Sequence, residues 1–221
     1  MQIVFDNTTL PQECQSLWGF SAYLKEYKLL FDTGSNGRVL LKNMKKLEVN
    51  VKEIEYVFIT HSHWDHIGGL DSIIELNPNV TLFLPSSLSK HLIKDLESLV
   101  KRVVICTKKP MKLFDNLYTT GVLGSEMPEQ ALIVDNDRAK VITGCGHFGI
   151  ENITQIAKDF LGKNIFCVEG GFHLLRSDEE KIRETILQLK EMGVECAHAT
   201  HCTGEKGIEM FNREFKLENF I

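Results

Sequence analysis

The chain has 221 residues, of which 43% are hydrophobic, so it is long enough for one sizeable core but short for two full domains. A single domain spanning residues 1–221 is therefore expected. The formal net charge of -5 argues against a nucleic-acid or membrane-surface binder, because such binding depends on concentrated lysine and arginine.

The first half of the chain predicts strands followed by helices. Short apolar runs predict strands at residues 3–5, 20–25, 28–31 and 56–59. Helical spacing of apolar residues predicts helices at residues 39–47, 71–76 and 86–100. In the last helix, Leu88, Leu92, Leu96 and Leu99 share the face expected to meet the core, and His91 is expected in solvent.

The second half repeats this order. Strands are expected at residues 117–121, 131–134, 140–143, 165–168 and 195–199, with a hairpin turn at 135–138. Helices are expected at residues 150–161 and 177–192, the second with an N-cap in residues 177–180. Because both halves of the chain have strands followed by helices, the sequence predicts two packed β-sheets with helices outside.

The six cysteines lie far apart and form no Cys-x-x-Cys pair, so most are expected to be reduced and buried. Cys145 and Cys202 lie close to His147 and His201, where they could be thiolate ligands or small packing residues. The N-terminus lacks an export signal and no apolar run reaches membrane-spanning length. A cytoplasmic protein without a membrane partner is expected.

The most informative segment is His61-Ser62-His63-Trp64-Asp65-His66, which follows the predicted strand at residues 56–59. On extended backbone, His61 and His63 point the same way and can bind one cation. Asp65 and His66 follow as the chain turns, so they can face a second cation.

The remaining ligands are expected directly after other predicted strands. His147 can complete the first set and His201 the second. Glu169 and His173 follow a third strand. A metal ligand, a substrate contact and a structural hydrogen bond all remain open for His173, and a metal ligand, capping or pairing for Glu169. His198 lies inside a strand and is expected to pack in the core.

These residues resemble the metallo-β-lactamase superfamily, in the His-x-His-x-Asp-His motif and the turn Phe31-Asp32-Thr33-Gly34. The segments at residues 18–21, 128–132, 144–150, 170–174 and 201–204 are similar to one branch, the metal-dependent hydrolases grouped with the archaeal dihydropterin aminobenzene-phosphate synthase. The resemblance implies an α+β fold, a four-layer αβ/βα sandwich of two mixed β-sheets with helices on both outer faces.

The resemblance also implies roles for single residues. His61, His63 and His147 would hold one metal, Asp65, His66 and His201 the other, and Asp32 would orient the loop. Where most of the superfamily has an aspartate bridging the metals, this chain reads Gly170-Gly171-Phe172-His173. The second metal is therefore expected to bind weakly, or His173 to take over.

Hydrolysis is the expected chemistry, because Zn²⁺ lowers the pKa of bound water from about 15.7 towards 7 and so supplies hydroxide at neutral pH. One or two such ions are expected, with Mn²⁺ or Fe²⁺ as alternatives. The hydroxide would attack an ester-like or phosphoester bond of a small molecule, with Asp65 and His173 positioning water and stabilising charge.

Two alternatives remain open: a pterin-forming transferase like the branch's named synthase, and a non-catalytic metal-binding protein. Trp64 could wall the pocket. An anionic substrate would suit Lys108, Lys109, Lys112 and Arg176, which are otherwise solvated surface charges. No nucleic-acid partner is expected, and the sequence does not indicate an oligomeric state.

Overall fold

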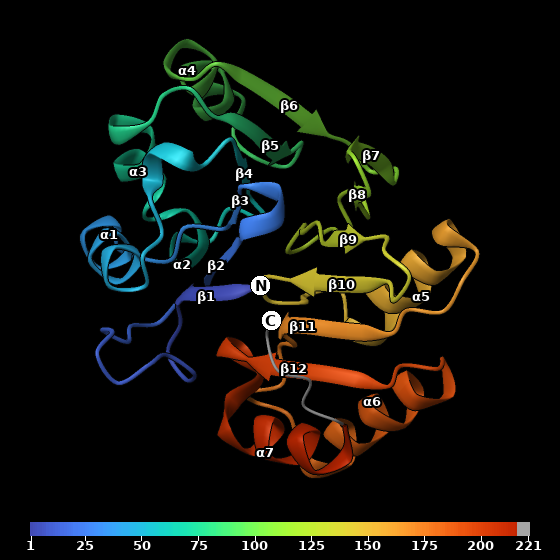
Figure 1. The fold of residues 1–221 in the computed structure, drawn as a ribbon. Coiled ribbons are helices and arrows are strands. Elements are labelled where there is room, and N and C mark those ends of the chain that lie inside the picture. Colours follow the sequence, from blue (N-terminus) through green and yellow to red (C-terminus); the bar gives the residue numbers. More distant parts are fainter. Residues whose placement is uncertain (216–221) are drawn as a thin grey trace. The chain divides into compact units, whose positions relative to one another are not determined.

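The computed structural model describes residues 1–215 (Figure 1). Within this range the chain forms two compact units, Met1–Cys106 and a second that begins at Thr107. Each unit contains one six-stranded mixed sheet and its own helices. The α+β class and the two mixed sheets are therefore confirmed, whereas the single domain expected from the sequence stays a prediction.

The sheet of the first unit follows chain order, β1-β2-β3-β4-β5-β6. Its strands are β1 (Gln2–Phe5), β2 (Ser21–Leu24), β3 (Leu29–Phe31), β4 (Tyr56–Phe58), β5 (Thr81–Pro85) and β6 (Arg102–Cys106). Strand β2 pairs antiparallel with both β1 and β3, whereas β3 to β6 pair in parallel. The carboxyl ends of β3 and β4 therefore meet at one edge of the sheet, where a ligand site can form.

The helices of the first unit are α1 (Gly37–Lys46), α2 (Trp64–Ile67), α3 (Leu70–Leu76) and α4 (Lys90–Leu99). Helix α1 begins where the Asn36 side chain accepts a hydrogen bond from the Val39 N–H at 3.1 Å. Apolar residues of α1 and α3, such as Leu40 and Ile73, pack in one core with strand residues such as Leu82. This core holds the sheet against its helices and fixes the strand ends.

The sheet of the second unit has the order β12-β11-β10-β9-β8-β7. Its strands are β7 (Met111–Phe114), β8 (Leu117–Thr119), β9 (Leu132–Val134), β10 (Lys140–Thr143), β11 (Cys167–Gly171) and β12 (Cys196–Thr200). Strands β7 to β10 are antiparallel, whereas β10, β11 and β12 are parallel. Three parallel strands thus bring three strand-end loops to one edge.

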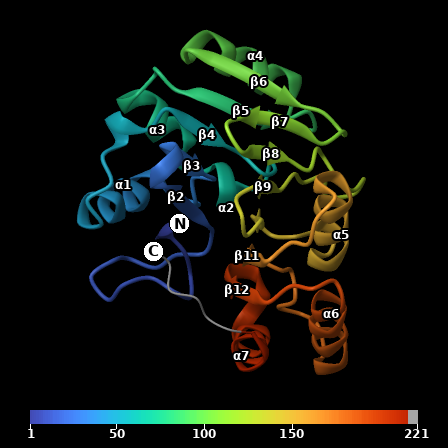
Figure 2. The same ribbon diagram turned by 45° about the vertical axis from the view of Figure 1, so that its right-hand side comes forward.

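Three helices cover one face of the second sheet: α5 (Ile150–Leu161), α6 (Glu179–Glu191) and α7 (Gly204–Glu214) (Figures 1 and 2). Their buried residues, among them Ile153, Ile186 and Phe211, share a core with strand residues. Helix α6 begins at the expected N-cap, where the Asp178 carboxylate accepts the Lys181 N–H at 2.9 Å.

The structure joins Cys167 and Cys196 in a disulfide across β11 and β12. The two residues are register partners with Cα atoms 4.5 Å apart, within the range that a disulfide requires. The expectation of reduced cysteines holds for the other four, Cys14, Cys106, Cys145 and Cys202.

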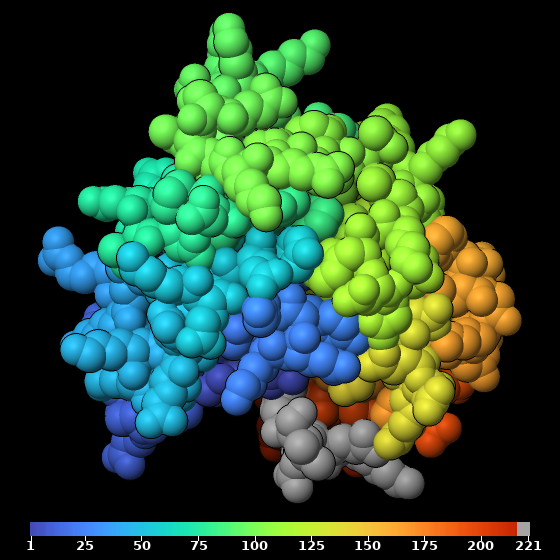
Figure 3. All heavy atoms as spheres, turned by 45° about the horizontal axis from the view of Figure 1, so that its top comes forward, coloured from blue at the N-terminus to red at the C-terminus, as the bar shows by residue number. Residues whose placement is uncertain are grey.

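The sequence interpretation missed strands β5, β6 and β7, the last of which contains Lys112. Leu99 was expected in the core but is 54% exposed, because α4 ends there and buries only Leu96 within its length. Figure 3 shows long side chains of the green segment that contains α4 projecting outward. His91, on this helix, is exposed as expected. Within residues 1–215 no helix is both long and apolar enough to cross a membrane.

Candidate metal centre

The histidine motif lies where β4 leaves the first sheet. Strand β4 ends at Phe58, His61 and His63 follow it, the latter on extended backbone, and α2 then begins at Trp64. The Nε2 atom of His61 lies 3.0 Å from Nδ1 of His63. Two imidazole nitrogens this close are placed where they could bind one cation.

Asp32 is fully buried at the end of β3 and organises this motif. Its carboxylate accepts the Thr60 N–H and the Thr60 hydroxyl, each at 2.8 Å, and lies 2.7 Å from Nδ1 of His66. Since the Thr60 hydroxyl donates its hydrogen to Asp32, it accepts a hydrogen bond from the Nδ1–H group of His61, 2.8 Å away. Nδ1 is thereby the protonated nitrogen of His61, and Nε2 is the nitrogen presented to a cation.

His66 and Asp65 form the second part of the motif, and both are buried. The bond from Nδ1 of His66 to Asp32 turns its Nε2 towards the Asp65 carboxylate, 3.7 Å away. A nitrogen and a carboxylate oxygen at this separation can share one cation. The donor set of the first unit, three imidazoles and a carboxylate, therefore fits a divalent transition metal.

Three predicted site residues have left-handed backbone. Asp32 has φ 50°, His173 has φ 53° and His201 has φ 50°. Such a conformation costs a non-glycine residue about 1–3 kcal/mol and persists where the surroundings fix it, often at a functional site. The strain therefore supports a function for these strand ends.

In the second unit, Glu129 organises the loop after β10, a role that the sequence did not reveal. Its buried carboxylate accepts the backbone N–H groups of Cys145 at 2.8 Å, Gly146 at 3.1 Å and His147 at 2.8 Å. Three successive N–H groups on one carboxylate fix the backbone that presents His147. Glu129 thus supports this loop as Asp32 supports the first.

The second unit gathers its predicted site residues around Cys145. The ligand atoms of Cys145, His147 and His173 all lie within 4.8 Å of one another, as do those of Cys145, His201 and Cys202. The rings of His147 and His173 are 4.4 Å apart between centroids. This cluster of imidazoles and thiols also fits a transition metal.

The thiol of Cys202 is electrostatically perturbed. Burial raises its pKa, but hydrogen bonds with Cys145 and His173 outweigh this effect and hold the pKa well below the ordinary thiol value. The same hydrogen bond with Cys202 raises the pKa of His173. A lower thiol pKa makes the thiolate, the form that binds metals, easier to reach.

Two further candidate residues lie inside strands. Glu169 is buried on β11 and accepts a charge-assisted hydrogen bond from Lys140 at 3.1 Å, the pairing that the sequence left open. His198 is buried within β12, as expected of a core residue. The assignment of His147 and His201 to cations shared with residues 61–66 stays a prediction.

The two mixed sheets with their helices define an α+β fold, and the His-x-His-x-Asp-His motif after β4 supplies candidate metal ligands. The family model of the metallo-β-lactamase superfamily matches residues 16–126. The chain belongs to this superfamily, which includes many metal-dependent hydrolases, and it has the metallo-β-lactamase fold.

Named relatives are similar over most of the chain. The 7,8-dihydropterin-6-methyl-4-(beta-D-ribofuranosyl)-aminobenzene-5'-phosphate synthase of Methanocaldococcus jannaschii is 30% identical over 86% of this chain and 80% of its own length. The solved structure of Tm1679, a metal-dependent hydrolase of the β-lactamase superfamily, has a TM-score of 0.79 with 27% identity, covering 97% of this chain and 92% of its own. Human tRNase Z, short form, shares the fold with a TM-score of 0.64 and 15% identity, covering 98% and 95%.

Proposed function

We propose that the protein is a metal-dependent hydrolase of ester-like or phosphoester bonds in a small molecule. The observation that carries this proposal is the hydrogen-bonded chain from His66 through Asp32 and Thr60 to His61, which sets the orientation of two imidazoles before a cation binds. The 27% identity to a metal-dependent hydrolase, over nearly the whole length of both chains, supports the same reaction class.

The ligand sets are those that the sequence predicts. His61, His63 and His147 would hold one divalent cation, and Asp65, His66 and His201 a second, with Zn²⁺ favoured and Mn²⁺ or Fe²⁺ as alternatives. When bound, such a cation lowers the pKa of water towards about 7 and polarises the scissile bond. Asp32 accepts hydrogen bonds from the loop that carries His61, and Glu129 accepts them from the loop that carries His147.

The protein's own groups position the substrate. His173 is exposed at the end of β11 beside His147, where its imidazole can hold or deliver a proton at the leaving oxygen. Asp65 is buried in α2 and would orient water through its carboxylate.

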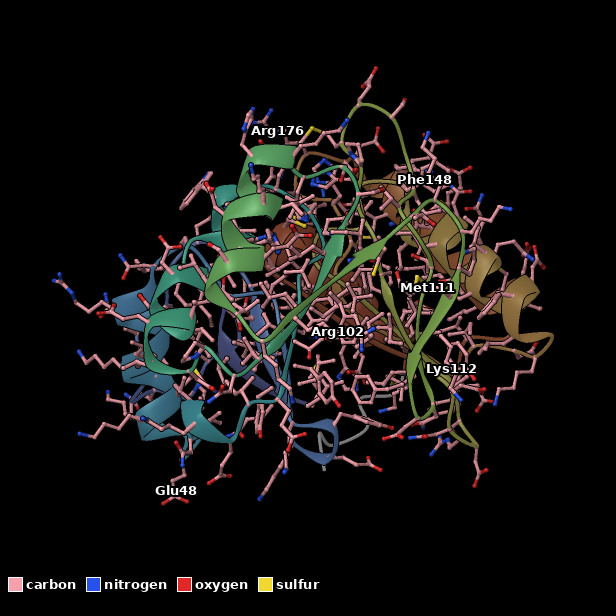
Figure 4. The ribbon with its side chains drawn as sticks, turned by 90° about the horizontal axis from the view of Figure 1, so that it is seen from above. Glu48, Arg102, Met111, Lys112, Phe148 and Arg176 are labelled. Carbon is pink, nitrogen blue, oxygen red and sulfur yellow. A yellow bond between two sulfur atoms is a disulfide. The ribbon has the colours of Figure 1, made fainter. Side chains whose placement is uncertain are left out.

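Exposed apolar side chains suggest a substrate with an apolar part. In the first unit, Trp64 is 63% exposed inside the motif. In the second unit, Phe148 beside His147 is 39% exposed and Leu175 is 53% exposed. Arg176, also exposed, adds a positive charge next to Leu175 for an anionic group. The side chains of Phe148 and Arg176 lie at the surface of the molecule (Figure 4).

A substrate panel tests the proposal. Purified protein loaded with Zn²⁺ should hydrolyse at least one of a set of phosphodiesters, lactones and thioesters, and His61→Ala should abolish this turnover. His91→Ala, which changes an exposed histidine on α4, is the matched control and should keep full activity. Activity that survives metal removal would sink the proposal.

The second candidate is a pterin-forming transferase, favoured by the 30% identity to the dihydropterin aminobenzene-phosphate synthase. The panel should therefore include a pterin pyrophosphate together with an aminobenzene phosphate. Turnover of that pair alone would assign the protein to the transferase class. A protein that binds metal but turns over nothing in the panel would support the third alternative, non-catalytic metal binding.

A further inference from the structure

We propose that the thiolates of Cys145 and Cys202 are metal ligands, and that with His201 they form a mixed sulfur and nitrogen site in the second unit. The inference deepens the proposed function, because His201 is already assigned there to a cation. It gives His201 two sulfur partners within its own unit, as an alternative to the pairing of His201 with Asp65 and His66 that the resemblance implies.

The topology brings the two cysteines to one place. Cys145 follows β10 and Cys202 follows β12, and both strands pair in parallel with β11 between them. The intervening strand ends at Gly171, where a Cβ atom would lie 2.7 Å from the Cys202 sulfur and 2.4 Å from the Gly144 carbonyl oxygen. The absence of a side chain at Gly171 therefore makes room for this sulfur beside the loop that carries Cys145.

The distances suit a tetrahedral ion. Zn–S bonds of about 2.3 Å and Zn–N bonds of about 2.0–2.1 Å place neighbouring ligand atoms about 3.5–3.8 Å apart in a tetrahedron. In the structure the sulfur atoms of Cys145 and Cys202 and a ring nitrogen of His201 lie within 4.8 Å of one another. Small side-chain rotations would close the remaining gap.

Burial and local geometry support ligation rather than packing. Cys145 is 4% exposed, Cys202 5% and His201 0%, so water does not compete freely for these groups. The Cys202 thiol donates a hydrogen bond to the Cys145 carbonyl at 3.3 Å, which fixes its sulfur next to the cluster. His201 keeps its left-handed backbone at this point, a strain that simple packing of small residues does not require.

The donor set predicts which metal the protein selects. Each thiol releases its proton to solvent as its sulfur binds the ion. Thiolates with imidazole favour zinc or iron, whereas manganese and magnesium prefer oxygen ligands. Zinc should therefore compete well against manganese.

A further group of possible metal ligands within the second unit combines Cys167, Cys196 and His198. Its two sulfurs are joined in the disulfide, so they are not available as thiolates. A Cys167→Ala/Cys196→Ala variant is therefore the control for that cluster. Cys14→Ser, in the first unit, is the control for an unrelated thiol.

The test is cobalt substitution of the full-length protein. Apo-protein loaded with Co²⁺ should show a near-ultraviolet sulfur-to-cobalt charge-transfer band. This band should weaken by about half in Cys145→Ser and in Cys202→Ser, because each removes one of two sulfurs. It should disappear in the double variant and persist in both controls. A bound cobalt ion without the band, or a band lost only with Cys167 and Cys196, would overturn the inference.

X-ray absorption at the zinc edge tests the unaltered protein, in case the serine variants fail to fold. Two sulfur scatterers at about 2.3 Å are expected. A shell of nitrogen and oxygen alone refutes the sulfur ligands even if the protein hydrolyses its substrate, and leaves the proposed function intact. Sulfur scatterers in a protein that hydrolyses nothing would support the inference while the proposed function fails.

Discussion

The substitution Glu129→Ala should destabilise the protein strongly. The variant removes a carboxylate that accepts three backbone N–H groups, at 2.8, 3.1 and 2.8 Å, in an environment where Glu129 is 2% exposed. Hydrogen bonds to a charged group contribute about 1.5–3 kcal/mol each, and they are less than additive when they share one acceptor. We expect the free energy of unfolding to fall by about 3–5 kcal/mol.

Glu129→Gln provides the graded comparison. One amide oxygen can still accept the Cys145 and Gly146 N–H groups, but the amide nitrogen would face the His147 N–H, donor against donor. A smaller loss of about 2 kcal/mol is expected.

Urea unfolding followed by circular dichroism measures both variants, with the metal-free protein used throughout so that binding does not contribute. A Glu129→Ala protein with an unfolding free energy within about 1 kcal/mol of the unaltered chain would refute the reasoning. If the Gln and Ala variants lose the same free energy of unfolding, the two hydrogen bonds that Gln can still accept contribute nothing without the carboxylate charge.

Three further changes test single contacts. Thr60→Val removes the hydroxyl between Asp32 and His61 and should weaken zinc affinity about 10- to 100-fold in a competition titration with a chelator; an unchanged affinity would exclude an orienting role for Thr60. Gly171→Ala should cost about 1–3 kcal/mol, because its Cβ would lie 2.4 Å from the Gly144 carbonyl oxygen, and an unchanged urea midpoint would contradict that close approach. Asp178→Ala removes the N-cap of α6 and should lower the free energy of unfolding by about 1 kcal/mol, measured by the same urea method. An unchanged free energy of unfolding would mean that the cap contributes nothing.

The features that the sequence predicted correctly depend on local patterns. The helix expected at residues 150–161 has the same bounds as α5, because its apolar spacing ends at Gly162, the left-handed C-cap. The histidines after predicted strands also cluster within each unit, since the carboxyl ends of parallel strands meet at one edge.

The features that the sequence missed depend on contacts between distant segments. Glu129 meets N–H groups that lie 16 to 18 residues further along the chain, and nothing in its own neighbourhood indicates them. Cys167 and Cys196 are 29 residues apart and become neighbours only through the register of β11 and β12. Strand β5 is a short buried run, whose periodicity does not distinguish a strand from part of a helix.

The central claim is that the His-x-His-x-Asp-His motif holds catalytic metal. The most direct measurement is the metal content of the purified protein, determined by elemental mass spectrometry alongside its activity on the substrate panel. One to two transition-metal ions per chain are expected, with loss of metal and activity together in His61→Ala and retention of both in His91→Ala. A chain that binds no transition metal, or a His61→Ala protein with unchanged metal content and activity, would contradict the account.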